Sequence, residues 1–299
     1  MADQIGFIGL GIMGRPMALN LRRAGHALWV HARRPENMAP LVAAGATACA
    51  SAREVAEHSD IIFTMVSDTD DVEQVINGEH GIVEGLRPGS IVVDMSTISP
   101  SATRALADLL ETLGGEMLDA PVSGGEKGAI DGTLSIMVGG KAKVFARVRP
   151  LFEKMGKNVI HIGDNGAGQV AKACNQVVIT QAIAAIGEAY LLAAANGVDP
   201  RKVREALLGG FASSRALESH GLRMLDGNYQ PGFKTHLHKK DMRIVMESAT
   251  ETGIALPGTA LVTQLINTAV GQGMGEDDSI SIFRIQQKLC GVQVDRQED

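Results

Sequence analysis

The stretch of sequence that decides the fold is Ile5-Gly6-Phe7-Ile8-Gly9-Leu10-Gly11-Ile12-Met13-Gly14. An apolar, strand-like run passes directly into a Gly-x-Gly-x-x-Gly pattern, and a helical pattern follows from Pro16 to Ala24. In a strand–turn–helix unit the first glycine permits the tight turn, the second lets the backbone approach a pyrophosphate, and the third lets the helix pack against the strand. The free N–H groups of the helix then receive the negative charge. The predicted dinucleotide-binding loop consists of Gly9, Leu10, Gly11, Ile12, Met13 and Gly14.

Short apolar runs rich in Ile and Val alternate with helix-like stretches through the first half of the chain. They are Ile5–Ile8, Leu28–Val30, Ile61–Val66, Ile91–Val93, Met117–Leu118, Leu134–Val138 and Val159–Ile162. Such alternation is typical of crossover units in a mainly parallel sheet, where ligands bind at the carboxyl ends of the strands. We therefore expect an α/β fold that begins with a doubly wound Rossmann-type domain. A glycine turn without a ligand is the alternative interpretation of residues 9–14, and the repeated alternation argues against it.

The strand pattern stops near residues 163–168, and everything after it has the pattern of helices. The sequence therefore predicts a dinucleotide-binding domain over residues 1–164 and an all-α domain for substrate binding and oligomerisation over residues 165–299. The first helix of the second domain, Gln169 to Ala195, is apolar on all faces and would be about 40 Å long at ~1.5 Å per residue. Its polar residues make it a weak membrane span, so we expect a buried core helix.

The composition narrows the class of protein. A chain of 299 residues with 45% hydrophobic and 21% charged residues has the usage of a globular protein with two domains. Lys and Arg number 28 against 34 Asp and Glu, and this net charge of −6 argues against nucleic acid as a partner. Three widely spaced cysteines, Cys49, Cys174 and Cys290, predict neither a disulfide framework nor a zinc knuckle. Because Asp3 and no basic region precede the first apolar run, we expect a cytoplasmic protein that binds no membrane.

The end of the second strand bears on the choice of nicotinamide cofactor. A free ribose 2′-hydroxyl is usually held by Asp or Glu about 20 residues after the glycines, whereas a 2′-phosphate needs cations. Residues 30–35 read Val-His-Ala-Arg-Arg-Pro, with no carboxylate before Glu36. Arg33 and Arg34 can hold a phosphate dianion through charge-assisted hydrogen bonds, so we expect NADP(H) to be preferred and NAD(H) to be a second cofactor. The alternative is that Arg33 stacks on the adenine and that either cofactor binds.

Two more strands of this half end in small polar residues. Residues 64–68 read Thr-Met-Val-Ser-Asp, and residues 94–97 read Asp-Met-Ser-Thr. These segments lie where a ribose and a nicotinamide would run, at the carboxyl ends of the strands. The candidate cofactor contacts are Val66, Ser67 and Thr97. Capping of the following helix is an equally good explanation of Ser67 and Ser99.

A candidate anion site follows the next strand. Residues 119–125 read Asp-Ala-Pro-Val-Ser-Gly-Gly and precede a stretch predicted to be irregular. Consecutive small residues let backbone N–H groups converge on an anion, and the Ser123 hydroxyl adds a donor. The candidate contacts of a substrate carboxylate are therefore Ser123, Gly124 and Gly125. A turn without a ligand is the competing interpretation.

One narrow polar stripe crosses the apolar helix. Its members, at spacings of three and four, are Gln169, Lys172, Gln176 and Thr180, and Asn175 lies close to the same line. A buried Lys is costly unless it is paired or faces a cleft, and burial lowers the pKa of an ammonium group toward neutral pH. Lys172 is therefore the candidate proton donor and acceptor. The alternative is a Lys that snorkels to solvent or pairs with a carboxylate of the sheet domain.

A second polar cluster is His236-Leu237-His238-Lys239-Lys240-Asp241. Two histidines could suggest a metal ion, but no third ligand is spaced to join them and two ammonium groups repel a cation, so no metal is expected. Lys240 reaching a cofactor amide or a substrate oxygen, with Asp241 holding a catalytic Lys, explains the cluster better.

Four of these motifs, in order and spacing, resemble the β-hydroxyacid dehydrogenase family over nearly the whole chain. They are Phe7–Gly14, Asp119–Gly125, Gly166–Asn175 and Lys240-Asp241. Within the family, residues 119–126, 131–140 and 237–241 are most similar to tartronate semialdehyde reductases. The resemblance implies a helical second domain built around a long helix, and a homodimer or homotetramer.

The resemblance also implies roles for single residues. Lys172 would be the proton donor and acceptor, and Thr97 and Lys240 would lie against the cofactor. The substrate's carboxylate end would be held by Ser123, Gly124, Gly125 and Asn175. Many relatives that prefer NAD have Asp where this chain has Ala32, so that preference is not carried over.

The implied reaction is the NAD(P)H-dependent reduction of tartronate semialdehyde (2-hydroxy-3-oxopropanoate) to glycerate. The nearest alternative is another short hydroxyacid of the family: 3-hydroxyisobutyrate, 4-hydroxybutyrate with succinic semialdehyde, or serine. Pocket volume around Ser123, Phe211, Phe233 and Asp241 would decide between them. An alternative of a different class is a non-catalytic NADP-binding sensor, which would lack Lys172 or Asn175, and both are present.

Overall fold

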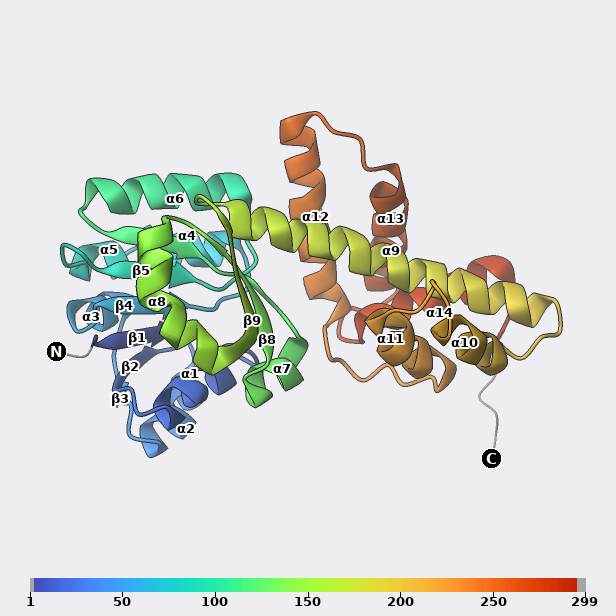
Figure 1. Cartoon of the computed structure of the whole chain (residues 1–299), viewed down its shortest axis with the longest axis horizontal. Coiled ribbons are helices and arrows are strands. Elements are labelled where there is room, and N and C mark those ends of the chain that lie inside the picture. The colour runs from blue at the N-terminus through green and yellow to red at the C-terminus, as the bar shows by residue number, and fades with distance from the viewer. Residues whose placement is uncertain (1–2, 295–299) are drawn as a thin grey trace. The chain divides into compact units, whose positions relative to one another are not determined.

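The computed structural model describes residues 3–294 and divides the chain into two compact units, one up to Lys172 and the other from Ala173 onward (Figure 1). The elements of the first unit are β1 (Ile5–Ile8), α1 (Gly14–Arg23), β2 (Leu28–His31), the 3-10 helix η1 (Pro35–Met38), α2 (Ala39–Ala43), β3 (Thr47–Ala48), α3 (Ala52–Glu57), β4 (Ile61–Thr64), α4 (Thr69–Asn77), α5 (Ile82–Gly85), β5 (Ile91–Asp94), α6 (Pro100–Thr112), β6 (Glu116–Asp119), β7 (Val122–Ser123), α7 (Gly125–Asp131), β8 (Leu134–Gly139), α8 (Ala142–Met155) and β9 (Gly156–Gly163).

The sheet of this unit has the strand order β3-β2-β1-β4-β5-β6-β8-β7, and β9 pairs with β8. Strands β1 to β6 run parallel, and β1 lies between β2 and β4, so Ile5 has Leu28 on one side and Ile61 on the other. The direction in which strands are added reverses between β1 and β4, and in such sheets ligands bind at the carboxyl ends of these strands. The predicted doubly wound domain is confirmed.

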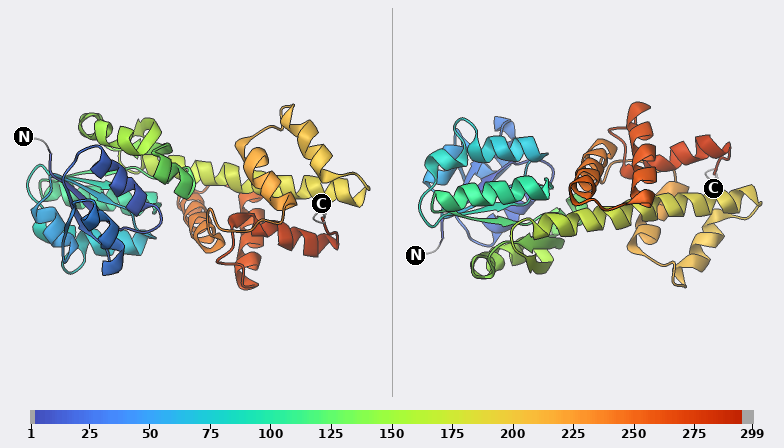
Figure 2. Two further views of the ribbon diagram at one scale, coloured as in Figure 1. Left: turned by 90° about the horizontal axis from the view of Figure 1, so that it is seen from below. Right: turned by 90° about the horizontal axis from the view of Figure 1, so that it is seen from above.

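Side chains of the parallel strands alternate between two apolar layers. Ile5 and Phe7 pack with residues of α1, α2 and α8, whereas Ile8 packs with residues of α3, α4, α5 and α6. This alternation follows from the two-residue period of a strand, and it buries the strands on both faces, as is usual for parallel sheets. Figure 2 shows the helices on both sides of the sheet.

The edge of the sheet beyond β6 differs from the sequence-based prediction. The stretch after Gly125, predicted to be irregular, is the short helix α7, and β7 pairs antiparallel with β8. Glycines in the left-handed region bound this helix, Gly124 with a φ of +136° before it and Gly132 with a φ of +65° after it. Glycine tolerates these angles and ends a helix readily, so a helix of seven residues fits between two apparent turn signals.

The second unit is made of helices, which confirms the predicted all-α domain. Its elements are the greater part of α9 (Ala167–Ala195), α10 (Pro200–Leu208), α11 (Arg215–Leu225), α12 (Thr235–Thr252), α13 (Pro257–Gly271), the 3-10 helix η2 (Ser279–Ser281) and α14 (Ile282–Cys290). One apolar core joins them, with members such as Ile183, Leu217, Met242, Ile266 and Phe283. Tyr190 of α9 meets Phe283 of α14 edge to face, with ring centroids 6.3 Å apart.

Helix α9 is long and apolar enough to cross a membrane by length and composition, but a core helix passes the same test. Ile183 and Tyr190 belong to the core of the second unit, whereas Val178 is 69% and Leu192 68% exposed. The expected core helix is thus found along one side of α9, which packs into the core of this unit, while another side is exposed.

The division of the structure into two compact units falls inside α9, after Lys172, whereas the domain boundary predicted from the sequence lies between residues 164 and 165. Two hydrogen bonds explain the difference. Gly166 and Gln169 donate their backbone N–H groups to the carboxylate of Asp119, at the end of β6. The first turn of α9 is thus held by the sheet of the first unit.

Candidate functional site

The glycine-rich loop lies at the carboxyl end of β1, beside the point where the order of the strands reverses. Gly9 has a φ of +92°, which L side chains rarely adopt, and it donates its N–H to the carbonyl of His31. A Cβ on Gly14 would lie 1.9 Å from the carbonyl oxygen of Gly9, so helix and turn touch there. A Cβ on Gly11 would meet nothing within 4 Å. In a dinucleotide-binding loop the first glycine makes the turn, the second lets a phosphate approach and the third lets the helix pack on the strand. Gly9, Gly11 and Gly14 have the geometries expected for these three roles.

The start of α1 fits an anionic ligand. No side chain caps the helix and no acidic residue lies in its first turn, so nothing in the sequence of the helix competes with an incoming phosphate. Ile12 is half-exposed and Met13 is partly buried at the N-cap position. Leu10, in contrast, is buried in the apolar layer, so only its backbone is available to a ligand.

The loops after β4 and β5 are joined by hydrogen bonds. Ser96 Oγ accepts from the Val66 N–H at 2.9 Å, and Thr64 Oγ1 donates to Asp94 Oδ1 at 2.8 Å. Asp68, not Ser67, caps α4, which leaves Ser67 exposed, whereas Ser99 does cap α6. The capping explanation therefore holds for Ser99 and fails for Ser67.

Asp94 is a buried carboxyl below these loops. Its Oδ1 accepts from Thr64 and from the Ser96 N–H, and among residues 3–294 nothing donates to its Oδ2. Burial raises its pKa from the ordinary 3.8 to about 6, against the effect of these hydrogen bonds and with a smaller contribution from Asp119 on the next strand.

The two arginines that follow β2 are both exposed. Arg33 lies 3.7 Å from Asp71 in a solvent-exposed ion pair, which contributes little in water. His31 of β2 places its Nδ1 3.1 Å from the carbonyl oxygen of Cys49. Both guanidinium groups thus remain accessible to a phosphate.

The predicted carboxylate site lies on β7 and at the start of α7. Ser123 is partly buried and pairs with Ser135 of β8, Gly124 is exposed, and Gly125 has a φ of +61°. The unusual backbone angles of Gly124 and Gly125 require glycine, so these residues have a conformational role whether or not a ligand binds.

The polar stripe of α9 is buried, although the rest of the helix is largely apolar. Gln169 is 1% and Lys172 7% exposed, and Gln176 and Thr180 are buried as well. Gln169 donates through Nε2 to the carbonyl of Ser96 at 2.8 Å and accepts through Oε1 from the Ile98 N–H at 3.2 Å. Within the first unit, α9 is therefore tied to the backbone on both sides of Thr97.

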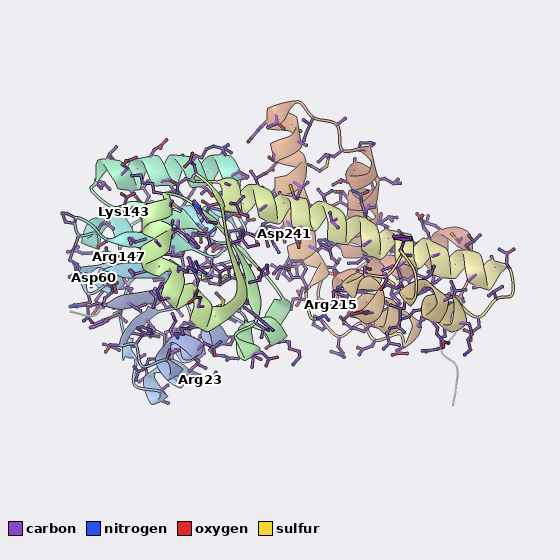
Figure 3. All side chains as sticks on the ribbon, viewed as in Figure 1. Arg23, Asp60, Lys143, Arg147, Arg215 and Asp241 are labelled. Carbon is purple, nitrogen blue, oxygen red and sulfur yellow. The ribbon has the colours of Figure 1, made fainter. Side chains whose placement is uncertain are left out.

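The candidate residues of the second unit form one hydrogen-bonded chain. Asn175 Nδ2 donates to Gln176 Oε1 at 2.8 Å, and Gln176 Nε2 donates to Asp241 Oδ2 at 2.6 Å. Lys240 Nζ lies 2.9 Å from Asp241 Oδ1, and both side chains are mostly buried. Asp241, labelled on α12 in Figure 3, thus joins Lys240 to the Gln176 amide. Sequence reasoning placed Gln176 on the stripe without assigning it this role.

The two histidines of α12 have separate environments. His238 is buried with Nε2 2.6 Å from Thr180 Oγ1, while His236 faces the Gly275 carbonyl and the carboxylate of Glu276. In the part of the chain that the structure describes, no group of three or more His, Cys, Asp and Glu side chains is arranged to hold a metal ion.

Sequence reasoning missed the buried carboxylates at the ends of β5 and β6, Asp94 and Asp119. Burial raises the pKa of Asp119, while the Gly166 and Gln169 N–H groups act in the opposite direction. A Cβ on Gly139 would lie 2.5 Å from Asp119 Oδ1, and one on Gly168 2.9 Å from Oδ2. These glycines are distant from Asp119 in the sequence, so no local signal could have pointed to this carboxylate.

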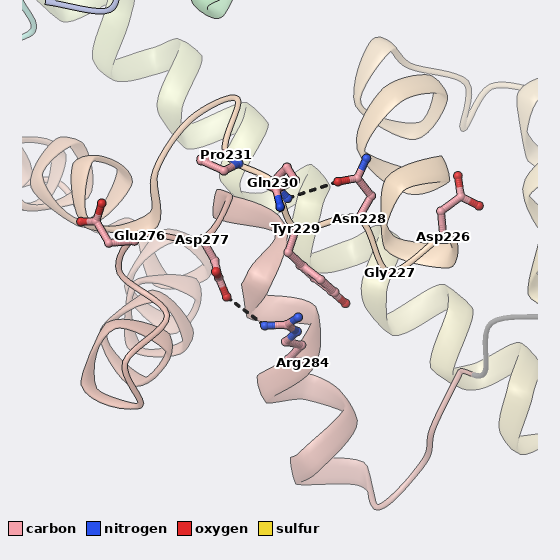
Figure 4. A pocket seen from close by; sticks show the side chains of 9 residues that line it. All are labelled: Asp226, Gly227, Asn228, Tyr229, Gln230, Pro231, Glu276, Asp277 and Arg284. Carbon is pink, nitrogen blue, oxygen red and sulfur yellow. Dashed lines mark hydrogen bonds and ion pairs between the residues drawn. The ribbon is translucent and has the colours of Figure 1, made fainter.

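The second unit also has an open cavity of about 520 Å³ outside the predicted site. Its lining, shown in Figure 4, is Asp226, Gly227, Asn228, Tyr229, Gln230, Pro231, Glu276, Asp277 and Arg284. Arg284 forms an ion pair with Asp277 at 2.8 Å and stacks on the ring of Tyr229. Its positive charge is therefore already paired within the cavity. No residue predicted to contact cofactor or substrate lines it.

Comparison with known proteins covers both units. The family profile of the NAD binding domain of 6-phosphogluconate dehydrogenase matches residues 4–163. The profile described as NAD-binding of NADP-dependent 3-hydroxyisobutyrate dehydrogenase matches residues 166–285.

Single proteins are similar over nearly their whole length. The 2-hydroxy-3-oxopropionate reductase of Escherichia coli (strain K12) is 51% identical over 281 residues, which is 94% of this chain and 96% of that protein. The 3-hydroxyisobutyrate dehydrogenase of Pseudomonas aeruginosa is 35% identical over 294 residues, 96% of this chain and 98% of that protein. Among solved structures, Mycobacterium tuberculosis 3-hydroxyisobutyrate dehydrogenase with L-serine superposes with a TM-score of 0.90 at 31% identity, covering 96% of this chain and 100% of that one.

Proposed function

Because this chain belongs to the β-hydroxyacid dehydrogenase family and is an NAD(P)-dependent oxidoreductase, we propose that it reduces tartronate semialdehyde to glycerate. The observation that carries the choice of substrate is the similarity, over nearly the whole chain, to the Escherichia coli 2-hydroxy-3-oxopropionate reductase. Relatives of the same family that are named for other hydroxyacids are less similar in sequence.

The first unit is suited to hold the dinucleotide. The pyrophosphate would lie over Gly11 at the uncapped start of α1, with Gly9, Leu10, Ile12, Met13 and Gly14 forming the loop. Further contacts would come from Val66, Ser67 and Thr97 at the ends of β4 and β5. When bound, the reduced cofactor supplies the hydride.

Preference for NADPH is supported by the residues after β2. Arg33 and Arg34 are exposed, and Ala32 is buried where a carboxylate would oppose a 2′-phosphate. Two guanidinium groups can each donate charge-assisted hydrogen bonds to that phosphate.

Lys172 would be the general acid and base. Its ammonium group would give a proton to the oxygen of the aldehyde as that oxygen gains negative charge, and it would take the proton back in the reverse reaction. Ser123, Gly124 and Gly125 would hold the substrate carboxylate. Candidate substrate contacts in the second unit are Asn175, Lys240 and Asp241, and Lys240 is also a candidate contact of the cofactor.

The test is the oxidation of reduced cofactor, followed by absorbance, with a panel of aldehydes that carry a carboxylate. Tartronate semialdehyde should give the highest kcat/KM, and NADPH should be used in preference to NADH. A higher kcat/KM for succinic semialdehyde or for the aldehyde of 3-hydroxyisobutyrate would assign the alternative substrate. No oxidation with any aldehyde, combined with tight NADPH binding, would indicate a sensor.

Two further predictions concern the whole protein. We expect a homodimer or homotetramer, which is supported by exposed apolar side chains of the second unit such as Val178, Leu192 and Leu261. We also expect a cytoplasmic location. Light scattering of the purified protein measures the first, and fractionation of the source cells measures the second.

A further inference from the structure

One buried amide joins the candidate catalytic helix to the candidate cofactor loop. Gln169 Nε2 donates to the Ser96 carbonyl, and Gln169 Oε1 accepts from the Ile98 N–H, so the amide bonds to the backbone on both sides of Thr97. Its side chain is 1% exposed, so water does not compete with either bond. Gln169 and Thr97 lie more than 70 residues apart in the sequence, and both belong to the first unit.

A carboxylate fixes the same helical turn to the sheet. Asp119 Oδ1 accepts from the Gly166 N–H at 2.8 Å and Oδ2 from the Gln169 N–H at 3.0 Å. Asp119 ends β6 and lies beside Asp94, the last residue of β5. Gln169 therefore has its backbone bonded to β6 and its side chain bonded to the loop after β5, so this turn of α9 is fixed at two points.

Lys172 lies three residues after Gln169. Residues three apart share one face of a helix and are separated by ~4.5 Å along its axis. If the hydrogen bonds between Gln169 and the loop change, this turn of the helix shifts relative to the loop. The position of Lys172 relative to Thr97 then changes as well.

We infer that Gln169 is a positioning residue, whose amide sets the place of Lys172 relative to the Thr97 loop. This assignment rests on the proposed function, in which Lys172 transfers the proton and Thr97 lies against the cofactor. Misplacement of a reacting group by about 1 Å can cost 10²-fold in rate, so loss of this link should lower kcat. If the Gln169 amide had only a structural role, its loss would lower the stability of the protein but leave the kcat of the folded protein unaltered.

Three variants separate these roles. Gln169→Leu removes both hydrogen bonds at similar volume. Gln169→Glu retains both hydrogen bonds while its carboxyl is protonated, because the O–H donates to the Ser96 carbonyl and the other oxygen accepts from the Ile98 N–H. Once the carboxyl is ionised, it has no donor and its negative charge repels the Ser96 carbonyl oxygen. Gln181→Leu is the matched control, since it removes a side-chain hydrogen bond from the same helix, to Thr259 of α13.

The first measurement needs no cofactor. Hydrogen exchange of the Ile98 amide should be at least about tenfold faster in Gln169→Leu than in the wild type, because the bond to Oε1 is lost. Gln181→Leu should leave this exchange rate unchanged. An Ile98 amide equally protected in Gln169→Leu would overturn the link itself.

The second measurement is kcat with NADPH and the aldehyde that the wild type reduces, from pH 5 to pH 9. Gln169→Leu should lose 10- to 100-fold at every pH, on the order expected for misplacement, and Gln181→Leu should match the wild type. Gln169→Glu should approach the wild type at low pH and fall toward Gln169→Leu as its buried carboxyl ionises. Each variant is compared with the wild type at the same pH, because burial raises the pKa values of Asp94 and Asp119, which end the neighbouring strands, in all of them.

The outcomes distinguish the two claims. An active wild type with a fully active Gln169→Leu variant would overturn the positioning role alone. A Gln169→Glu variant that is protonated at the low end of this pH range and still loses activity equally at all pH values would also overturn it, because the protonated form carries the same two hydrogen bonds. A wild type inactive toward every aldehyde would overturn the proposed function and the assignment together.

Discussion

Replacing Asp94 by Asn should make the stability of this protein less dependent on pH. The Asp94 carboxyl is fully buried, and burial raises its pKa from 3.8 to about 6. A raised pKa means that the folded protein holds this proton more tightly than the unfolded chain does. The contribution of the group to stability is therefore complete below pH 3.8 and is lost as the pH rises through about 6. Asn has no charge to bury at any pH.

The magnitude follows from the two pKa values. A rise from 3.8 to about 6 corresponds to about 3 kcal/mol of unfolding free energy between the acidic and the alkaline limit. About 1.4 kcal/mol of this falls between pH 5 and pH 8, because the unfolded carboxyl is already ionised at pH 5 and the folded one is not. Asp119, whose pKa burial also raises, loses a charged neighbour in the variant, which acts in the same direction.

The assay is urea unfolding of the wild type and Asp94→Asn at pH 5 and at pH 8. The unfolding free energy of the variant minus that of the wild type should rise by about 1.4 kcal/mol between the two pH values. Any constant cost of burying the Asn amide applies at both and cancels. Asp108→Asn, which removes one exposed carboxyl from α6, controls for the change in net charge. A difference that stays constant or falls from pH 5 to pH 8 would refute the assigned pKa direction.

Three further changes test the cofactor loop, the phosphate contacts and the proton donor. Gly14→Ala places a Cβ 1.9 Å from a backbone oxygen and should lower the unfolding free energy by about 1–3 kcal/mol. The Cβ of Gly11→Ala meets nothing within 4 Å, so this variant should keep the wild-type stability but bind NADPH more weakly. Equal stabilities of the two variants in urea unfolding would contradict this prediction. Replacing Arg33 and Arg34 together by Ala should raise the Kd for NADPH about 10- to 100-fold and change the Kd for NADH by no more than about twofold, as measured by cofactor fluorescence. Equal losses of affinity for the two cofactors would show that neither arginine contacts the 2′-phosphate. Lys172→Ala should lower kcat by about 10²-fold or more with the cofactor affinity retained, and more than a tenth of the wild-type kcat would exclude its role in proton transfer.

The parts of the fold that are read from local pattern could be predicted from the sequence. The run from Ile5 to Ile8 followed by three glycines predicts a strand, a turn and a helix, because each of these is set by residues within a few positions of one another. The buried polar stripe of α9 was found in the same way, by its spacing. Strand β7 and helix α7 were not, since each is held by pairing or by glycine angles that their own residues do not reveal.

The sequence names the candidate residues of the site but not the bonds between them. The Thr64–Asp94 bond spans 30 residues of sequence, the Gly166–Asp119 bond 47, and the Gln169–Ser96 bond 73. No periodic pattern links residues so far apart, and an Asp at the end of a strand looks the same whether it binds a ligand or caps a distant helix. The partners of Asp119 therefore had to come from the structure.

The position of these long bonds suggests why the first turn of α9 belongs to the sheet. The segments that follow β4, β5 and β6 are each only a few residues long, and several backbone groups after β4 and β5 bond to side chains. The side chains of Asp94, Ser96 and Gln169 satisfy these loop groups, and the side chain of Asp119 accepts from the Gly166 and Gln169 N–H groups at the start of α9. All four side chains are buried. The start of α9 is therefore anchored by buried hydrogen bonds, whereas Val178, farther along the helix, is exposed in the described part of the chain. Lys172, the proposed proton donor, lies three residues after Gln169 and so within one turn of that anchored start.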